Sequence, residues 1–201
     1  MHMQKNTWLG AFICAVISIN TVMICMLTFW AIDERQTLSI VQVEIQELKH
    51  RIEMEIKLRQ EILPQIKKST ELLSRYNPDL DPWTALTYAV KILQCSDEVV
   101  TPDLLTALIV IESGADHKAV GPHGALGLTQ IMPGLWPYQQ KDLRDPYTNI
   151  AAGAAILRQY IKRHGLIGGL RAYNCGASSQ SADGASLGYA KKVLQMAQSQ
   201  F

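Results

Sequence analysis

The segment IVIESGADHKAVGPHGALGLTQIMPG, from Ile109 to Gly134, places a glutamate at the end of an apolar run and a glycine-rich stretch directly after it. On a helix, Glu112 shares a face with Leu105 and Leu108, which precede it by seven and four residues. The run before the glutamate is apolar almost all round, as is typical of a helix at the centre of a domain. The segment therefore predicts a buried helix that ends in a carboxyl group.

Burial changes the chemistry expected of this carboxyl group. Glu112 falls in the last turn of the helix, where Gly114 is placed to end it in a left-handed conformation. Desolvation and the negative end of the helix dipole both disfavour the charged form, so both should raise the pKa of Glu112. A carboxylic acid that is protonated near neutral pH can act as a general acid, but a buried glutamate can also be structural and paired with a lysine or arginine. This helix alone leaves both interpretations open.

The rest of the C-terminal region also predicts helices and no alternating strands. Thr101–Pro102 and Asp145–Pro146 each place a capping side chain before a proline at the first helical position, and Gly165 marks a helix end. Helices are expected at residues 82–95, 102–112, 146–163, 170–174 and about 187–198. The fold class predicted for residues 81–201 is therefore all-α.

An uncharged run near the N-terminus extends from Thr7 to Ile32. About 20 apolar residues span a bilayer, so the run is long enough for a transmembrane anchor, with Trp8 and Trp30 where an aromatic belt would lie. A cleaved signal peptide is the alternative, although its apolar region is shorter and a phenylalanine stands where its cleavage site needs a small residue. The one lysine before the run weakly favours a short cytoplasmic tail, residues 1–6, with the rest of the chain outside the cytoplasm.

A helical stalk is expected over residues 33–80, between the anchor and the C-terminal domain. Apolar residues spaced alternately by three and four, as in a coiled-coil seam, are Leu38, Val41, Ile45, Leu48 and Ile52. The seam is interrupted at Glu55 and Arg59, and Pro64 should kink or end the helix near Leu63. The apolar stripe either packs on the following domain or associates weakly with a second copy, and both interpretations stay open.

The charge balance argues against one class of partner. The chain has 19 basic and 18 acidic residues and a net charge of +1, which gives no electrostatic footprint for nucleic acid. Partners must therefore be inferred from local features.

Three ordered motifs are similar to those of one enzyme family. They are Glu112-Ser113-Gly114, the segment GALGLTQIMP from Gly124 to Pro133, and the segment AYNCG from Ala172 to Gly176. Together they resemble the lytic transglycosylases that carry the soluble-lytic-transglycosylase catalytic domain, over roughly residues 81–193. The resemblance implies an all-helical, lysozyme-like fold and cleavage of the glycan strands of peptidoglycan.

The resemblance also implies a role for each matched residue. Glu112 would be the single catalytic acid and base, and the product would be a 1,6-anhydromuramoyl end formed without water. The substrate-binding residues would be Ser113, Gln130, Met132, Tyr173 and Asn174. Ordinary glycosidases need a second carboxylate at a defined distance, and none accompanies Glu112 in these motifs.

The sequence departs from the family pattern at three positions. Gly121 stands where many members have a serine that could contact the sugar, so that contact is either missing or supplied by His123 or water. Thr129 replaces a methionine, which is expected to make the groove wall more polar, and Cys175 replaces an alanine. His123 has no histidine or cysteine at metal-ligand spacing, so an exposed loop residue is expected there, and no metal or cofactor.

The four cysteines fall into two pairs. Cys14 and Cys25 lie within the predicted membrane span, where a cysteine is an ordinary small hydrophobe. Cys95 and Cys175 are the pair outside it, and an oxidising periplasm would allow a disulfide between them. Sequence cannot test their separation, so the bond stays open.

These features together predict a peptidoglycan lytic transglycosylase anchored in a bacterial inner membrane through residues 7–32, with its catalytic domain, residues 81–201, in the periplasm. A phage-encoded protein that opens the wall, a secretion-apparatus component and a wall-remodelling enzyme all fit. A goose-type-lysozyme-like hydrolase and a non-catalytic wall-binding assembly protein are the alternatives.

Overall fold

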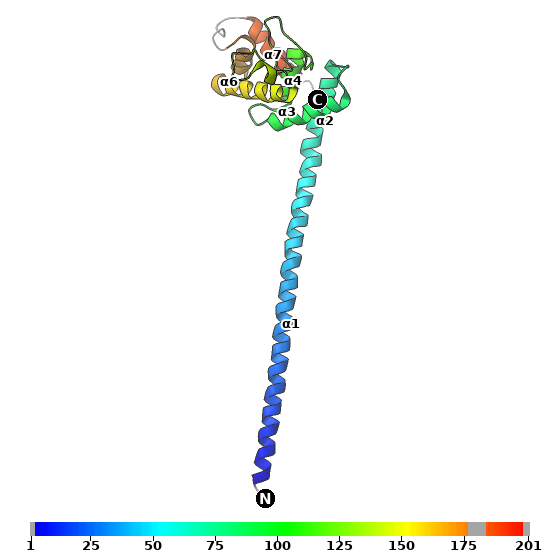
Figure 1. Cartoon of the computed structure of the whole chain (residues 1–201), viewed down its shortest axis with the longest axis vertical. Helices are drawn as coiled ribbons and strands as arrows, with labels where there is room; N and C mark the ends of the chain where they lie inside the picture. The colour runs from blue at the N-terminus through cyan, green and yellow to red at the C-terminus, as the bar shows by residue number, and fades with distance from the viewer. Residues whose placement is uncertain (1–2, 177–183, 199–201) are drawn as a thin grey trace. The chain divides into compact units, whose positions relative to one another are not determined.

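The structure is a computed structural model that describes the backbone of residues 3–176 and 184–198, with side chains from residue 20 onward in these ranges. The chain divides into two units, Met1–Lys57 and Leu58–Phe201. Its described residues form helices and no strand, with three isolated β-bridges in one loop. The predicted all-α class is therefore confirmed (Figure 1).

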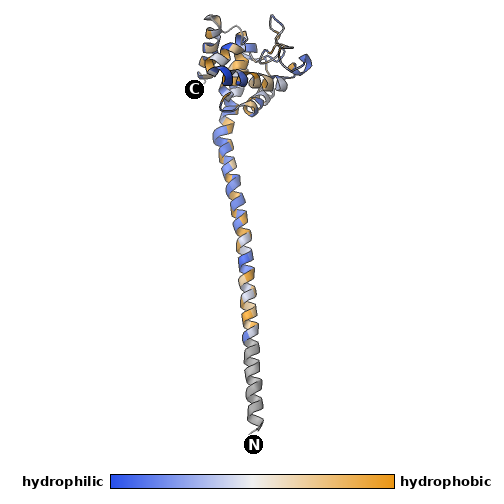
Figure 2. Cartoon of the chain, turned by 90° about the vertical axis from the view of Figure 1, so that its left-hand side faces the viewer, coloured by the Kyte–Doolittle hydropathy of each residue, from blue (hydrophilic) through white to orange (hydrophobic). Residues whose placement is uncertain are grey.

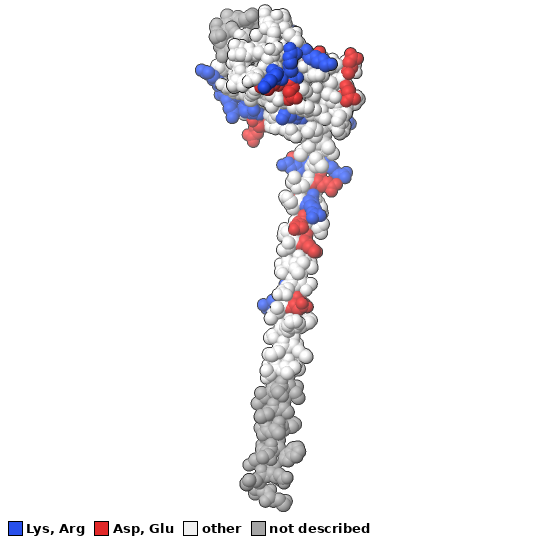
Figure 3. Space-filling view, in the orientation of Figure 1, with Lys and Arg blue, Asp and Glu red and all other residues white. Residues whose placement is uncertain are grey.

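The first unit is one helix, α1, Met3–Lys57. Figure 2 shows apolar residues interspersed with polar ones along the described part of α1, and Figure 3 shows charges of both signs on it. Among the residues whose side chains the structure describes, no helix is both long and apolar enough to cross a bilayer. Because residues 7–19 lie outside the described side chains, the anchor at residues 7–32 stays a prediction.

The chain stays helical around Pro64, but the five residues before Leu63 form a π-helix in place of an α-helix. Residues Leu58–Ile62 form a π-helix, η1, and α2 runs from Leu63 to Tyr76 with the proline in its first turn. A proline inside an α-helix lacks an N–H and clashes with the carbonyl four residues earlier, and a π-turn is a known way to absorb such a defect. The break near Leu63 is where the sequence predicts it.

The second unit begins at Leu58. The catalytic domain predicted at residues 81–201 lies within this unit, and α2 packs into the same core. Leu72 and Leu73 of α2 are buried, and the hydroxyls of Ser69 and Thr106 lie 2.9 Å apart. Lys68 Nζ donates to Asp103 Oδ2 over 2.8 Å, which adds an ion pair between the two segments. Only part of the predicted stalk therefore lies in the first unit.

The remaining helices begin and end close to their predicted positions, except for the short α5, which the sequence analysis does not predict. They are α3 (Pro82–Cys95), α4 (Pro102–Ser113), α5 (Gln140–Leu143), α6 (Pro146–Cys175) and α7 (Gly184–Gln198). Side chains of Asp81, Thr101 and Asp145 cap the helices that follow them, as expected of residues placed before a proline. Gly165 breaks α6 with φ 71° and ψ 173°, a conformation open to glycine, and so separates the two helical segments that the sequence predicts there.

Helix α4 lies at the centre of the second unit. Its seven consecutive residues from Leu104 to Val110 are all buried, and α2, α3 and α7 pack against it. Burial of so many apolar side chains is the main source of stability for a helix of this kind. The central helix expected from its composition is therefore present, and it fixes the position of Glu112.

Candidate active site

Glu112 lies in the last turn of α4, at the edge of the core. The helix ends at Gly114, which has φ 61°, in the left-handed conformation that the sequence predicts. The side chain is partly buried, and this burial raises the pKa of Glu112 from 4.5 to about 7. The predicted direction of the shift is confirmed, and the carboxyl group is available in its protonated form near neutral pH.

Tyr189 of α7 is the hydrogen-bond partner of this carboxyl group. Its hydroxyl donates to Glu112 Oε1, which holds the carboxyl in one orientation and lowers the pKa of Glu112 against the effect of burial. Burial and the nearby Glu112 raise the pKa of Tyr189 itself well above its usual value, so the tyrosine stays a donor. The sequence analysis does not identify Tyr189, because a tyrosine on an amphipathic helix carries no signal of its partner.

Tyr173 lies near the same carboxyl group, as predicted. Burial, and then the charge of Glu112, raises the pKa of Tyr173. Its hydroxyl donates to the carbonyl oxygen of Thr129 over 2.8 Å. This hydrogen bond ties the second half of α6 to the loop that follows α4. The tyrosine ring therefore lies near Glu112 while its hydroxyl holds the loop.

Thr129 is not on the groove wall, which corrects the expectation drawn from the sequence. It is fully buried, and its hydroxyl contacts the Asn149 side-chain oxygen at 2.7 Å and the Asn149 carbonyl at 3.0 Å. Its backbone N–H donates to the same side-chain oxygen over 2.8 Å. A Cβ at Gly153 would lie 2.6 Å from the Thr129 side chain, so this glycine gives the threonine its room. The threonine therefore locks the loop onto α6.

Gln130 holds the shape of the same loop. Its Nε2 donates to the carbonyl of Gly127 over 2.9 Å and lies 3.3 Å from that of Ala119. A Cβ at Gly121 would lie 2.6 Å from Gln130 Oε1, so the glutamine amide occupies the space that a side chain at 121 would need. The glycine at position 121 thus has a physical reason, because the Gln130 amide fills the space that a serine side chain there would occupy.

Ser113 has a structural contact of its own. Its hydroxyl lies 2.9 Å from the carbonyl of Leu128 and 3.1 Å from that of Ile109, so it links the end of α4 to the loop. It lines a polar hollow shared with Asn77, Asp116 and His117. Ser113 does not line the cleft that holds the other predicted binding residues, so its predicted contact with substrate stays a prediction.

A cleft of about 360 Å³ lies between the loop and the second half of α6. Four of the predicted binding residues line it, namely Gln130, Met132, Tyr173 and Asn174. His123 also lines it, as an exposed loop residue. Glu112 is not in its lining, but Tyr173 belongs to the cleft and is near enough for the charge of Glu112 to raise its pKa. The structure therefore brings these four residues together beside the buried acid.

Two aromatic residues of the cleft are missed by the sequence analysis. Trp136 and Tyr160 line it, and their rings meet edge to face with centroids 5.7 Å apart. Aromatic side chains with a few polar groups are the usual lining of small-molecule and sugar clefts. A tryptophan just after the glycine-rich segment was the signal that could have pointed to this wall.

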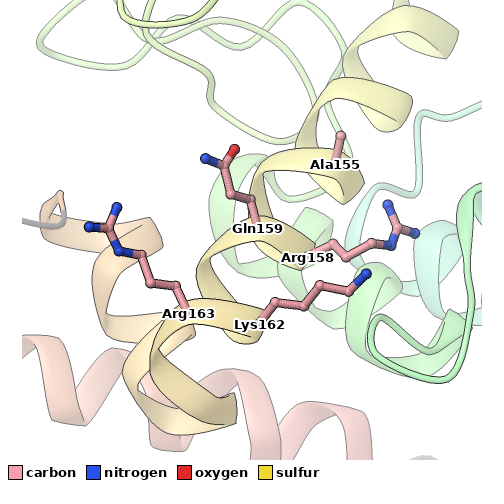
Figure 4. Close-up of a pocket in the computed structure, with 5 residues that line it drawn as sticks. All are labelled: Ala155, Arg158, Gln159, Lys162 and Arg163. Carbon is pink, nitrogen blue, oxygen red and sulfur yellow. The ribbon is translucent and has the colours of Figure 1, made fainter.

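A second hollow runs along another face of α6. It has a volume of about 530 Å³ and is lined by Ala155, Arg158, Gln159, Lys162 and Arg163 (Figure 4). Arg158 is held by Asp97 Oδ2 at 2.5 Å and by the carbonyl of Cys95 at 2.7 Å. Glu112 and the cleft residues are absent from this lining, so the hollow is separate from the candidate site.

The open disulfide prediction has a definite outcome in the structure. Neither Cys95 nor Cys175 is in a disulfide bond. The Cys175 thiol donates to the carbonyl of Arg171, one turn back on α6, and lines the cleft. Cys95 is the last residue of α3, and its side chain packs against the core. In the structure the two thiols are therefore held by different parts of the fold. Among the residues that the structure describes, no three His, Cys, Asp or Glu side chains gather as a metal site would require.

The sequence of residues 95–193, which carries this site, matches the family described as Transglycosylase SLT domain. The match covers just under half of the chain. The SLT domain includes Glu112, Tyr189 and the whole lining of the cleft.

Individual relatives agree with this assignment. The chain is 31% identical over 112 residues to an endo-type membrane-bound lytic murein transglycosylase A of Klebsiella pneumoniae, covering 47% of the chain and 54% of the relative. It is 30% identical over 96 residues to a transglycosylase of Enterobacteria phage PRD1, covering 47% of the chain and 36% of the relative. The Cronobacter sakazakii counterpart of the Klebsiella protein is 29% identical over 113 residues, covering 48% and 55%. The chain thus spans about half the length of the bacterial relatives it matches.

Proposed function

We propose that this protein is a peptidoglycan lytic transglycosylase with a lysozyme-like catalytic domain. It cleaves the β-1,4 bond between N-acetylmuramic acid and N-acetylglucosamine and leaves a 1,6-anhydromuramoyl end. The observation that carries the proposal is the buried carboxyl group of Glu112, with a pKa of about 7, next to the cleft of an SLT domain. The names of its relatives, lytic murein transglycosylase and transglycosylase, support the substrate and the reaction.

In the first step, protonated Glu112 donates its proton to the glycosidic oxygen. The bond between that oxygen and C1 of the muramoyl residue breaks, and N-acetylglucosamine leaves with its hydroxyl group restored. Burial keeps the acid protonated up to about pH 7, which suits a general acid at that pH. The hydroxyl of Tyr189 holds the carboxyl in place during this transfer.

In the second step, the Glu112 carboxylate takes the proton from the 6-hydroxyl of the same muramoyl residue as that oxygen bonds to C1. The acid is regenerated, and no water is consumed. One carboxyl group therefore suffices, whereas ordinary glycosidases need two. Asp116 is the nearest acid in sequence, but it is exposed, and its Oδ1 accepts a hydrogen bond from the backbone N–H of Lys118.

The cleft holds the glycan for this reaction. Met132, Trp136 and Tyr160 supply apolar and aromatic surface for the sugar faces, and Asn174 supplies a polar group at the rim. Gln130 acts mainly by fixing the loop, since its amide nitrogen donates to Gly127. Ser113 acts in the same way, by holding the loop to the end of α4.

The protein acts from a bacterial inner membrane on the periplasmic wall, with residues 7–32 as anchor and α1 beyond them as spacer. The bacterial relatives are named as membrane-bound enzymes, which supports this location, and a phage transglycosylase among the relatives supports local opening of the wall. Retention of the chain in membranes after an alkaline carbonate wash tests the anchor. Release into the wash contradicts it.

Product analysis tests the reaction. Purified peptidoglycan is digested with the wild-type chain and with Glu112→Gln, and the fragments are identified by mass spectrometry. We expect anhydromuramoyl ends with the wild type and none above background with the variant. Reducing ends alone would assign a lysozyme-like hydrolase instead. Wall opening that persists in Glu112→Gln would assign a wall-binding assembly protein.

A further inference from the structure

The apolar stripe of α1 is exposed over a length of two heptads. Its residues are Leu38, Val41, Ile45, Leu48 and Ile52, each between 44% and 56% exposed. They follow one another by three and four positions, so they form a single line on the helix surface. A continuous apolar line exposed along a helix marks a surface that binds another molecule.

The order of residue types along this stripe points to a two-stranded partner. In heptad positions Leu38, Ile45 and Ile52 occupy a, and Val41 and Leu48 occupy d. The middle heptad, with Ile45 at a and Leu48 at d, has the combination of a β-branched residue and leucine that favours parallel dimers over larger bundles. We infer that residues 38–52 form a short parallel coiled coil with the same residues of a second copy of this chain.

The charges beside the stripe are complementary in such a pair. Glu44 is at g and Lys49 at the following e, so Glu44 of each copy faces Lys49 of the other. Neither residue makes an ion pair within the described part of the chain, although Arg51 lies 3.8 Å from Glu47 on its own helix. Glu44 and Lys49, which make no ion pair on the described part of their own helix, therefore face each other between the two copies.

The chain also limits this contact to a short segment. The next d and a positions are Glu55 and Arg59, which would each face the same charge in a second copy. The α-helix itself ends at Lys57, where the π-helix begins and changes the register. Pairing therefore ends at Ile52.

A contact of two heptads is weak between chains that diffuse freely. Two copies anchored in one bilayer are held at a high effective concentration and in the same direction, which selects the parallel pair. The inference thus rests on the membrane anchor of the proposed function, while catalysis by Glu112 does not depend on it.

Cysteine cross-linking of the full chain in membranes tests the inference. In a background with all four native cysteines replaced by serine, Ile45→Cys on the stripe is compared with Gln46→Cys on the opposite face. Mild oxidation should give a disulfide-linked dimer with the first and only background with the second. Equal cross-linking of both variants, no dimer in either, or an adduct with a different polypeptide would overturn the inference.

Substitutions that swap the charges of Glu44 and Lys49 test whether the partner is a second copy of this chain. In the Ile45→Cys background, Glu44→Lys should lower the cross-linked fraction by about fivefold, because an attraction becomes a repulsion on both edges of the pair. Glu44→Lys combined with Lys49→Glu should restore it. Loss without restoration would overturn the pairing. Peptidoglycan digestion and membrane retention are measured on the same samples, so a failed dimer with intact activity is distinguished from a failed function.

Discussion

Helices α4 and α1 are both rich in apolar residues, yet they place a glutamate in opposite situations. Seven consecutive residues of α4 are buried, and Glu112 at its end has a pKa raised to about 7. On α1 the apolar residues are exposed, and Glu47 lies in a surface ion pair with Arg51 at 3.8 Å. The comparison teaches that burial of the carboxyl group, rather than the apolar content of its helix, gives it the properties of an acid catalyst.

The largest expected difference between the two helices is in catalysis. Glu112→Gln should lower the rate of peptidoglycan cleavage by about 10²- to 10⁴-fold, because general acid–base catalysis contributes about that much. The isosteric change Glu47→Gln on α1 should leave the rate unchanged. Release of soluble glycan fragments measures both. Cleavage by Glu112→Gln at the wild-type rate would remove the chemical distinction between the two glutamates.

The next difference is in stability. Leu108→Ala should lower the free energy of unfolding of the second unit by about 2 to 5 kcal/mol, because Leu108 is fully buried and its removal leaves a cavity. The control is Ile40→Ala on α1, where the side chain is 60% exposed and lies off the stripe, and it should cost less than about 0.5 kcal/mol. Denaturant unfolding measures each change. Similar losses in the two variants would contradict the contrast in burial.

Stability should also depend on pH through Glu112. Its folded-state pKa lies above the ordinary 4.5, so between pH 4.5 and about 7 the folded chain holds a proton that the unfolded chain has released. The contribution of Glu112 is complete below pH 4.5 and is lost as the pH rises through 7, by about 3 kcal/mol in total.

Unfolding of the wild type and of Glu112→Gln at pH 5 and pH 8 isolates this contribution. The wild type should lose more stability between the two values than the variant does. An identical loss in both proteins would mean that Glu112 is ionised in the folded state across this range.

The smallest expected effect is a shift of the pH profile. The Tyr189 hydroxyl lowers the pKa of Glu112, so Tyr189→Phe should raise that pKa and move the alkaline limb of kcat/KM to higher pH. Tyr147→Phe is the matched control, since that hydroxyl bonds Thr87 at 3.1 Å. A limb that stays in place, or moves to lower pH, would show that the tyrosine does not act on the acid.

Much of this fold could be predicted because its signals are local. The caps at Thr101 and Asp145, the glycine end of α4 and the break at Gly165 are set by residues within one turn of each other. The apolar character of α4 likewise predicts its burial and the direction of the Glu112 pKa shift. The motifs around Gln130 and Tyr173 predict a shared cleft, which the structure contains.

The sequence by itself thus determined the helices, the central position of α4 and the candidate acid, since each depends on neighbours along one helix. Only the tertiary structure decided that Tyr189 donates to Glu112, that Thr129 is locked by Asn149 and that Gln130 takes the space at Gly121. It also joined α2 to the C-terminal unit. These contacts link residues far apart in the chain, and their partners depend on how the helices pack, which no local pattern of residues specifies.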